Sequence, residues 1–207
     1  FQEGERLASF TTVKNFEDEN HYLFFVTQKG IVKRTHISNY QNIRTNGIIA
    51  LTLKDNDELI TVRSTDGNKD VILGASNGKA IRFKETEARE IGRTATGVRG
   101  MDLGDDDIIV GVAIISNDDQ DILVITEKGY GKRTKVGEYR QQNRGGKGVK
   151  TLNVTDKNGP LATLRAVTDL EDLIVASDKG ITIRLAISQI ANTKRATQGV
   201  RIISLKG

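Results

Sequence analysis

Arginine, lysine and glycine residues recur together along this 207-residue chain, and they are the residues best suited to bind a ligand. Two series of arginines repeat about every 50 residues: Arg34, Arg82, Arg133 and Arg184, and then Arg44, Arg93, Arg144 and Arg195. The planar guanidinium donors of arginine match phosphate oxygens. A neighbouring glycine allows the backbone to come close and to offer N–H donors as well. The pattern therefore favours a polyanion that carries phosphate groups.

The densest concentration of these residues lies between residues 140 and 150. It contains Arg140, Gln142, Asn143, Arg144, Gly145, Gly146, Lys147, Gly148 and Lys150. Such a loop is poor at reading bases, because it offers no constrained helix or ribbon for the major groove. We therefore expect it to bind the nucleic-acid backbone without sequence preference.

Other kinds of chemistry are disfavoured by spacing. The Gly-Gly-Lys element at 145–147 resembles a phosphate loop, but Gln141 stands where that motif needs glycine and Gly148 where it needs Ser or Thr. Asp105–Asp107 lack the spacing of a calcium loop and are expected to form a solvated turn. No Ser–His–acid set or poised carboxylate pair is apparent, so we expect no catalytic residue here.

Metal and stacking sites are also disfavoured. The chain has no cysteine, and His21 and His36 lie on different segments without ligand spacing, so we expect no metal site. Tyr40 and Tyr139 occupy matching positions after a basic segment and are expected to pack in the core rather than to stack on bases. No stretch has the length and hydrophobicity of a membrane span, no signal peptide opens the chain, and the lack of cysteine fits a reducing cytoplasm.

The elements that must position the basic residues are repeated four times. Each repeat has a short apolar run, a turn glycine, a basic strand, a polar loop, and then Arg, Gly and a further strand. The apolar runs are Leu23–Val26, Val71–Leu73, Ile122–Ile125 and Leu173–Val175, and the turn glycines are Gly30, Gly78, Gly129 and Gly180. A glycine at such a turn can take positive φ in a β-hairpin. A second series consists of Gly47, Gly97, Gly148 and Gly199.

These repeats predict an all-β propeller. A further strand is expected before each new repeat, at Glu58–Val62, Ile108–Ile115 and Leu161–Ala166. Four strands per ~50 residues is typical of a propeller blade. We place the four repeats approximately at 1–62, 63–115, 116–166 and 167–207, and expect Phe1–Phe16 to be the last strand of a preceding unit.

Charge is segregated within each repeat. The segments 30–53, 78–103, 129–154 and 180–205 together hold 20 basic and 5 acidic residues, a net charge of +15, whereas the rest of the chain carries −11. In a ring of equivalent units these segments would form one basic belt, which is the electrostatic footprint of a polyanion. The acidic residues Asp105–Asp107, Asp118, Asp119 and Asp121 are expected to lie elsewhere.

All four repeats resemble the C-terminal domain of DNA gyrase A subunits, a β-pinwheel (a propeller variant) that wraps DNA around its rim. The resemblance rests on GKAIRFKETEAREIGRTATGVRGM at 78–101, on GYGKRTKVGEY at 129–139 and on the Asn-Gly-Pro element at 158–160. The family's glycine-rich box, Gln-(Arg/Lys)-Arg-Gly-Gly-Lys-Gly, corresponds to 142–148, with Asn143 in place of a basic residue. The family's box lies in its opening blade, whereas this copy lies in the third repeat, so 142–148 is expected to be a second copy.

The resemblance implies one β-pinwheel domain of four four-stranded blades, belonging to a six-bladed ring. It implies wrapping of duplex DNA that enables negative supercoiling, with the catalytic tyrosine and the ATP and Mg²⁺ sites outside this chain. It also implies that the chain works with the rest of the gyrase A subunit, and with the B subunit, in an A2B2 assembly in the bacterial cytoplasm at the nucleoid. The residues expected to bind DNA are Lys33, Arg34, Arg44, Arg82, Lys84, Arg93, Arg99, Lys132, Arg133, Gln142, Asn143, Arg144, Gly145, Gly146, Lys147, Gly148, Lys150, Arg184, Lys194, Arg195 and Arg201.

Two alternatives stay open. One is the equivalent domain of topoisomerase IV. The other is a propeller that binds an acidic protein partner.

Overall fold

Each repeat opens with a β-hairpin set by its apolar run and its turn glycine. The computed structural model describes residues 4–178 and 180–204. The four hairpins are β1 (Tyr22–Thr27) with β2 (Ile31–His36), β4 (Asp70–Ala75) with β5 (Lys79–Lys84), β8 (Asp121–Thr126) with β9 (Tyr130–Lys135), and β12 (Asp172–Ala176) with β13 (Thr182–Ala186). The four turn glycines have φ between +76° and +80°, as their position predicts.

A third strand follows each of the first three hairpins and lies innermost in its sheet. These strands are β3 (Leu59–Thr65), β7 (Ile109–Ile115) and β11 (Leu161–Val167). Each pairs antiparallel with the first strand of its own hairpin, for example with Phe24 opposite Arg63. Short 3-10 helices follow the hairpins: η1 (Ile37–Tyr40), η2 (Glu85–Glu87), η3 (Val136–Glu138) and η4 (Ile187–Gln189).

The outermost strand of each complete sheet is donated by the next repeat. These strands are β6 (Val98–Arg99), β10 (Val149–Lys150) and β14 (Val200–Arg201). The sheets therefore have the orders β3-β1-β2-β6, β7-β4-β5-β10 and β11-β8-β9-β14. The segment that carries each donated strand, which we call the arm, also binds the turn of the hairpin that it joins. In the first sheet the carbonyl oxygen of Gly30 accepts the N–H groups of Gly100 (2.8 Å) and Met101 (3.3 Å). Neighbouring blades are interlocked rather than merely packed.

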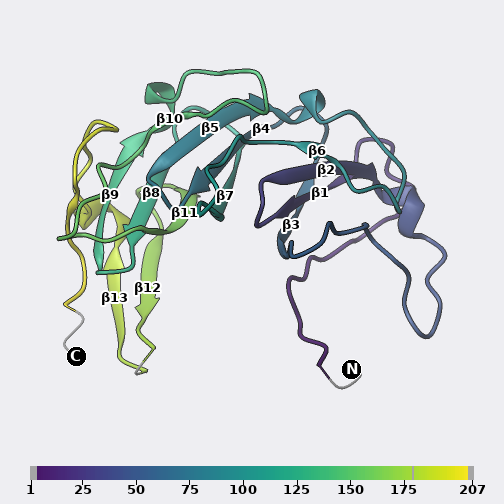
Figure 1. The fold of residues 1–207 in the computed structure, drawn as a ribbon, viewed down its shortest axis with the longest axis horizontal. Helices are drawn as coiled ribbons and strands as arrows, with labels where there is room; N and C mark the ends of the chain where they lie inside the picture. The colour runs from purple at the N-terminus through teal and green to yellow at the C-terminus, as the bar shows by residue number, and fades with distance from the viewer. Residues whose placement is uncertain (1–3, 179, 205–207) are drawn as a thin grey trace.

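The sheets form an open arc (Figure 1). The inner strands β3, β7 and β11 lie on its concave side, and β10 lies on its convex side. The core fills the spaces between sheets, where Phe24 and Val32 of the first sheet pack with Leu73 and Phe83 of the second. The all-β propeller architecture is thus confirmed. In the described residues, no helix is long and apolar enough to cross a membrane.

Two details differ from expectation. Three sheets have four strands, whereas β12 and β13 form a two-stranded sheet within the described residues. The predicted strand at Phe1–Phe16 is wrong for the described residues 4–16, which contain no strand. This segment instead runs along β3, where the N–H of Val62 donates to the Ser9 hydroxyl at 3.2 Å.

Candidate nucleic-acid interface

The donated outer strands present one exposed basic side chain in each complete blade. We call Arg99, Lys150 and Arg201 the outer ladder. Each follows a valine (Val98, Val149 or Val200), and alternation along a strand sends the two side chains to opposite faces. The side chain of Arg99 is 66% exposed. Strand exchange therefore places equivalent cations on the outermost strands of three successive blades.

Lys79 adds to the outer ladder and was missed by sequence reasoning. It lies opposite Lys150 in the β5–β10 pair, and both residues are exposed. Like charges directly opposite on paired strands are unfavourable. Lys79 could not be recognised locally, because the pairing joins residues from different repeats. Two adjacent lysines at a sheet edge suit a polyanion that neutralises both.

Two arginines of the second series hold the outer ladder in place. Arg144 donates to the carbonyl oxygen of Arg99 at 2.9 Å, and Arg195 donates to that of Lys150 at 2.8 Å. Arg93 makes the corresponding bond to the carbonyl of Ile49. These arginines are half-buried, so each fixes the preceding arm while its remaining surface faces solvent.

The first arginine series joins neighbouring blades. Arg34 donates to the carbonyl of Ala88 at 3.0 Å, and Arg82 donates to that of Val136 at 3.3 Å. Arg133 donates to the carbonyl of Ile190 at 2.8 Å. Each arginine thus reaches the segment around the 3-10 helix of the next blade. Arg184 occupies the equivalent position in the two-stranded sheet, where its side chain is 73% exposed.

Acidic partners neutralise most of this first series. Arg82 pairs with Asp70 at 2.7 Å and Arg133 with Asp121 at 3.1 Å, while Arg184 contacts Asp172. The expectation that Asp121 lies on a separate acidic surface is therefore wrong, because its side chain is only 3% exposed. Asp118 also lies beside a basic residue, with its Oδ1 3.4 Å from Arg82. In the first blade the ring of Tyr22 takes the place of the acid, 4.7 Å from the Arg34 guanidinium carbon.

Lys33 and Lys132 are buried and bind backbone carbonyls. The ammonium group of Lys33 donates to Ala50 O at 2.6 Å and to Arg93 O. That of Lys132 donates to Lys194 O at 2.6 Å and to Arg195 O. Burial, and then the nearby charges of Arg93 and Arg195 respectively, lower the pKa of each lysine to about 8. The structure gives both lysines a role in holding the next repeat's arm.

The glycine-rich segment 142–148 turns much of its backbone toward protein. The N–H of Gly145 donates to Gly100 O at 2.6 Å, and the N–H of Gln142 donates to Arg82 O at 2.8 Å. A Cβ on Gly148 would collide with the carbonyl oxygen of Ala80, so this glycine permits close approach of the neighbouring blade. Asn143 and Lys147 are exposed, whereas Gly146 is half-buried. The segment therefore joins two blades and exposes Lys147 to solvent.

The remaining predicted residues Arg44, Lys84 and Lys194 are exposed. Arg140, which belongs to the basic loop 140–150, is exposed as well. Two exposed basic residues, Arg89 and Lys135, lie outside the predicted set. These positions could have been found by counting every basic residue in the positively charged segments rather than only those in register.

The two tyrosines expected to pack in the core are confirmed to be buried. Tyr139 is 1% exposed, and burial raises its pKa to about 12. Tyr40 is also buried and donates its hydroxyl to Ala50 O at 3.2 Å. His36 lies in β2 and caps η1 by accepting the N–H of Ser38 at 3.3 Å, while His21 Nε2 lies 2.6 Å from the Ser64 hydroxyl. Within residues 4–178 and 180–204, no group of three or more His, Cys, Asp or Glu residues is arranged so that it could bind a metal ion.

A family model described as "DNA gyrase C-terminal domain, beta-propeller" matches residues 21–66, 69–116, 120–168 and 171–207. The DNA gyrase A subunit of Staphylococcus epidermidis (strain ATCC 12228 / FDA PCI 1200) is 45% identical over 205 residues, which is 99% of this chain and 23% of the relative. Its counterpart from Staphylococcus aureus (strain MRSA252) is 44% identical over the same shares. The chain therefore spans about a quarter of the length of the curated relatives it matches.

Two solved structures share the fold. A gyrase A C-terminal domain aligns with a TM-score of 0.89 at 22% identity, covering all of this chain and 69% of that one. The C-terminal domain of a DNA topoisomerase IV aligns with a TM-score of 0.88 at 29% identity, covering 93% of this chain and 60% of that one.

Proposed function

The chain belongs to the DNA gyrase C-terminal domain family, and on this premise we propose that it binds duplex DNA along its outer ladder without reading sequence. The observation that carries the proposal is the recurrence of Arg99, Lys150 and Arg201 on three successive outer strands. Contacts of this kind neutralise phosphates and carry no base information.

The contact set proposed here is narrower than the basic belt of the sequence. The outer ladder and Lys79 form its centre, and the exposed residues Arg44, Lys84, Lys147 and Lys194 flank it. The exposed faces of the half-buried Arg93, Arg144 and Arg195 contribute next to it. Lys33, Lys132 and Arg133 act indirectly, because their donors are already bound to protein groups.

The curvature of the arc suits wrapping. Bending 20–30 base pairs by 40–90° costs about 1–6 kcal/mol. Phosphate contacts distributed over several blades can offset that cost, since no single arginine has to supply it. DNA bent in this way would be presented to the rest of the gyrase A subunit, with the B subunit, in an A2B2 enzyme of the bacterial cytoplasm. That enzyme would introduce negative supercoils, with its ATP, Mg²⁺ and catalytic tyrosine held outside this chain.

A second candidate is the corresponding domain of topoisomerase IV, which the 29% identity to such a domain favours. Both candidates place duplex DNA on the same surface. They differ in whether the bent DNA leads to net supercoiling by the whole enzyme. Supercoiling of relaxed plasmid by the reconstituted enzyme separates them.

The salt dependence of DNA affinity tests the proposal. If this surface neutralises 6–10 phosphates, log K should fall against log salt with a slope of about −5 to −9. Fluorescence anisotropy with a duplex of unrelated sequence, between 50 and 200 mM salt (roughly the usual range for such slopes), measures it. A slope near zero, or binding that depends on one DNA sequence, would contradict the proposal and favour a protein partner.

A further inference from the structure

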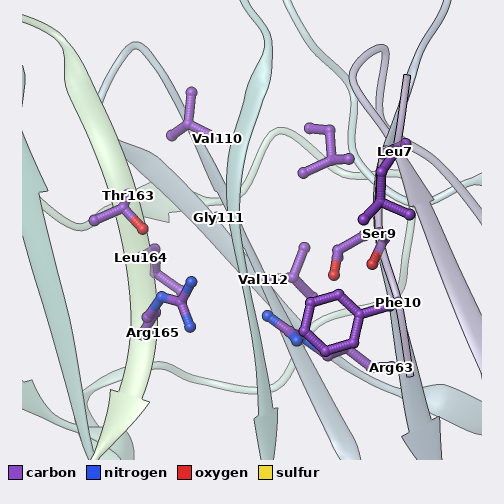
Figure 2. A pocket seen from close by; sticks show the side chains of 13 residues that line it. Leu7, Ser9, Phe10, Arg63, Val110, Gly111, Val112, Thr163, Leu164 and Arg165 are labelled. Carbon is purple, nitrogen blue, oxygen red and sulfur yellow. The ribbon is translucent and has the colours of Figure 1, made fainter. Parts of the chain in front are cut away.

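A cavity of about 520 Å³ lies among the inner strands, on the opposite edge of the sheets from the outer ladder. It is lined by β3, β7 and β11 and by the N-terminal segment 7–10 (Figure 2). The sheet order places three strand spacings between inner and outer strands, about 14 Å. A ligand in this cavity would therefore be separate from DNA bound on the outer ladder.

Two arginines from equivalent positions face this cavity. Arg63 lies opposite Phe24 in the first sheet, and Arg165 lies opposite Leu123 in the third. Figure 2 shows Arg165 on one side of the strand that carries Gly111 and Val112, and Arg63 on the other. The second sheet has Ala113 at the corresponding position, so no side-chain charge separates the two arginines along the inner strands.

Neither guanidinium has a counterion among residues 4–178 and 180–204. Within the described part of the chain, Arg63 and Arg165 make no side-chain hydrogen bond or ion pair, and none of the described residues lining the cavity is Asp or Glu. Burial, and then the charge of Arg165, lower the pKa of Arg63. This contrasts with Arg82 and Arg133, each of which has a carboxylate partner.

The remaining lining provides hydroxyl groups and apolar surface. The hydroxyls belong to Ser9, Thr61 and Thr163. The Ser9 oxygen accepts the N–H of Val62, which leaves its own O–H available as a donor. Leu7 and Phe10 add apolar surface, and both are largely exposed in this structure. The cavity thus combines two cations with neutral donors, and its volume lies in the range of small-molecule sites.

We propose that this cavity binds a small molecule with two or more linked phosphate groups, bridging Arg63 and Arg165. One anion of charge −2 or more would neutralise both guanidinium groups at once. Arginine donors match phosphate oxygens in pairs, and the hydroxyls of Ser9 and Thr163 would complete the hydrogen bonding. The ligand we propose is a free polyphosphate, and the following test distinguishes it from DNA phosphates that reach the same arginines.

Pyrophosphate serves as the probe, measured by titration calorimetry and by thermal unfolding in chloride buffer. The wild-type chain should bind pyrophosphate and unfold at a higher temperature in its presence. Arg63→Met and Arg165→Met should each weaken binding at least ~10-fold, the loss of one charge-assisted contact. Lys14→Met, which removes an exposed charge outside the cavity lining, should leave pyrophosphate binding unchanged.

A second readout distinguishes a lost ligand site from a damaged fold. Without pyrophosphate the two arginine variants should be at least as stable as the wild type, because the repulsion between like charges is relieved. Their affinity for duplex DNA should also stay unchanged. The proposal fails if the wild type shows no binding or stabilisation with millimolar pyrophosphate, or if both variants bind it equally well. Loss of DNA affinity in both variants would instead assign these arginines to DNA and also overturn a separate site.

Discussion

Lys132 and Lys150 lie in the same repeat and carry the same side chain, yet the structure gives them opposite environments. Lys132 is fully buried with its ammonium on two carbonyl oxygens, whereas Lys150 is exposed on the outer strand. The difference depends on the arm of the next repeat, which covers Lys132. At the scale of single residues, therefore, the periodic basic residues divide into those that hold blades together and those whose exposed side chains could make the proposed DNA contacts.

Replacing Lys132 with Met should destabilise the domain by about 2 kcal/mol at pH 7, because two carbonyl oxygens lose their donor. The pKa of Lys132 is about 8 in the folded chain and 10.5 when unperturbed. Between these values the folded protein has released the proton and the unfolded chain has kept it, so rising pH favours folding. Urea unfolding at several pH values should therefore show the wild type gaining stability over the variant between pH 8 and 10.5.

The matched control is Lys150→Met. Its side chain is exposed, and among the described residues its Nζ donates only to Asn153 Oδ1, at 3.2 Å, so stability should change little while DNA affinity falls. If Lys132→Met were as stable as the wild type and as defective in DNA binding as Lys150→Met, Lys132 would belong to the interface.

At the scale of elements, the arms that pass between blades organise both the fold and the candidate interface. Each arm carries a glycine of the second series, an outer strand and a ladder residue. The carbonyl of the preceding turn glycine binds it, as Gly78 does for Thr151 (2.8 Å) and Leu152 (3.1 Å). Disturbing an arm should therefore affect blade cohesion and ladder position together.

Gly148→Ala should lower the free energy of unfolding by about 3 kcal/mol. A positive φ of +70° is strained for alanine, and the new Cβ would collide with the Ala80 carbonyl oxygen. Gly47→Ala tests the backbone strain alone, because Gly47 has φ +79° and no described atom lies within 4 Å of the position that a Cβ would take. It should lower the free energy of unfolding by only about 1 kcal/mol. Gly137→Ala, with ordinary φ and open space, should be neutral. Equal losses for Gly148→Ala and Gly47→Ala in urea unfolding would show that the arm does not dock tightly.

Sequence reasoning predicted the elements that depend on local signals. The hairpins follow from apolar runs that end in glycine, and the positive φ of Gly30, Gly78, Gly129 and Gly180 was expected from the turn. The exchange of outer strands could not be predicted, because β2 and β6 are separated by a complete hairpin and β6 is only two residues long. The burial of Lys33 and the pairing of Lys79 with Lys150 could not be predicted either, because both depend on that exchange.

At the scale of the whole molecule, the described residues form an open arc with basic side chains on its outermost strands. Its inner strands carry an arginine pair that has no acidic partner among those residues. The net charge of the positive segments overstates the charge available to the proposed DNA partner, because Arg82, Arg133 and Arg184 have acidic partners and Lys33 and Lys132 are buried. The proposed interface is therefore a ladder repeated from blade to blade rather than a uniform belt.

Charge reversal on the two edges of the arc tests this account most directly. Arg99→Glu with Lys150→Glu changes the outer ladder, and Arg63→Glu with Arg165→Glu makes the same change of net charge on the inner strands. The measurement is the affinity for a duplex of about 40 base pairs, several turns of B-DNA. This affinity should fall at least ~100-fold in the outer variant and only slightly in the inner variant, although both variants have the same net charge. Equal losses in the two variants, with both folded, would contradict an interface on the outer ladder.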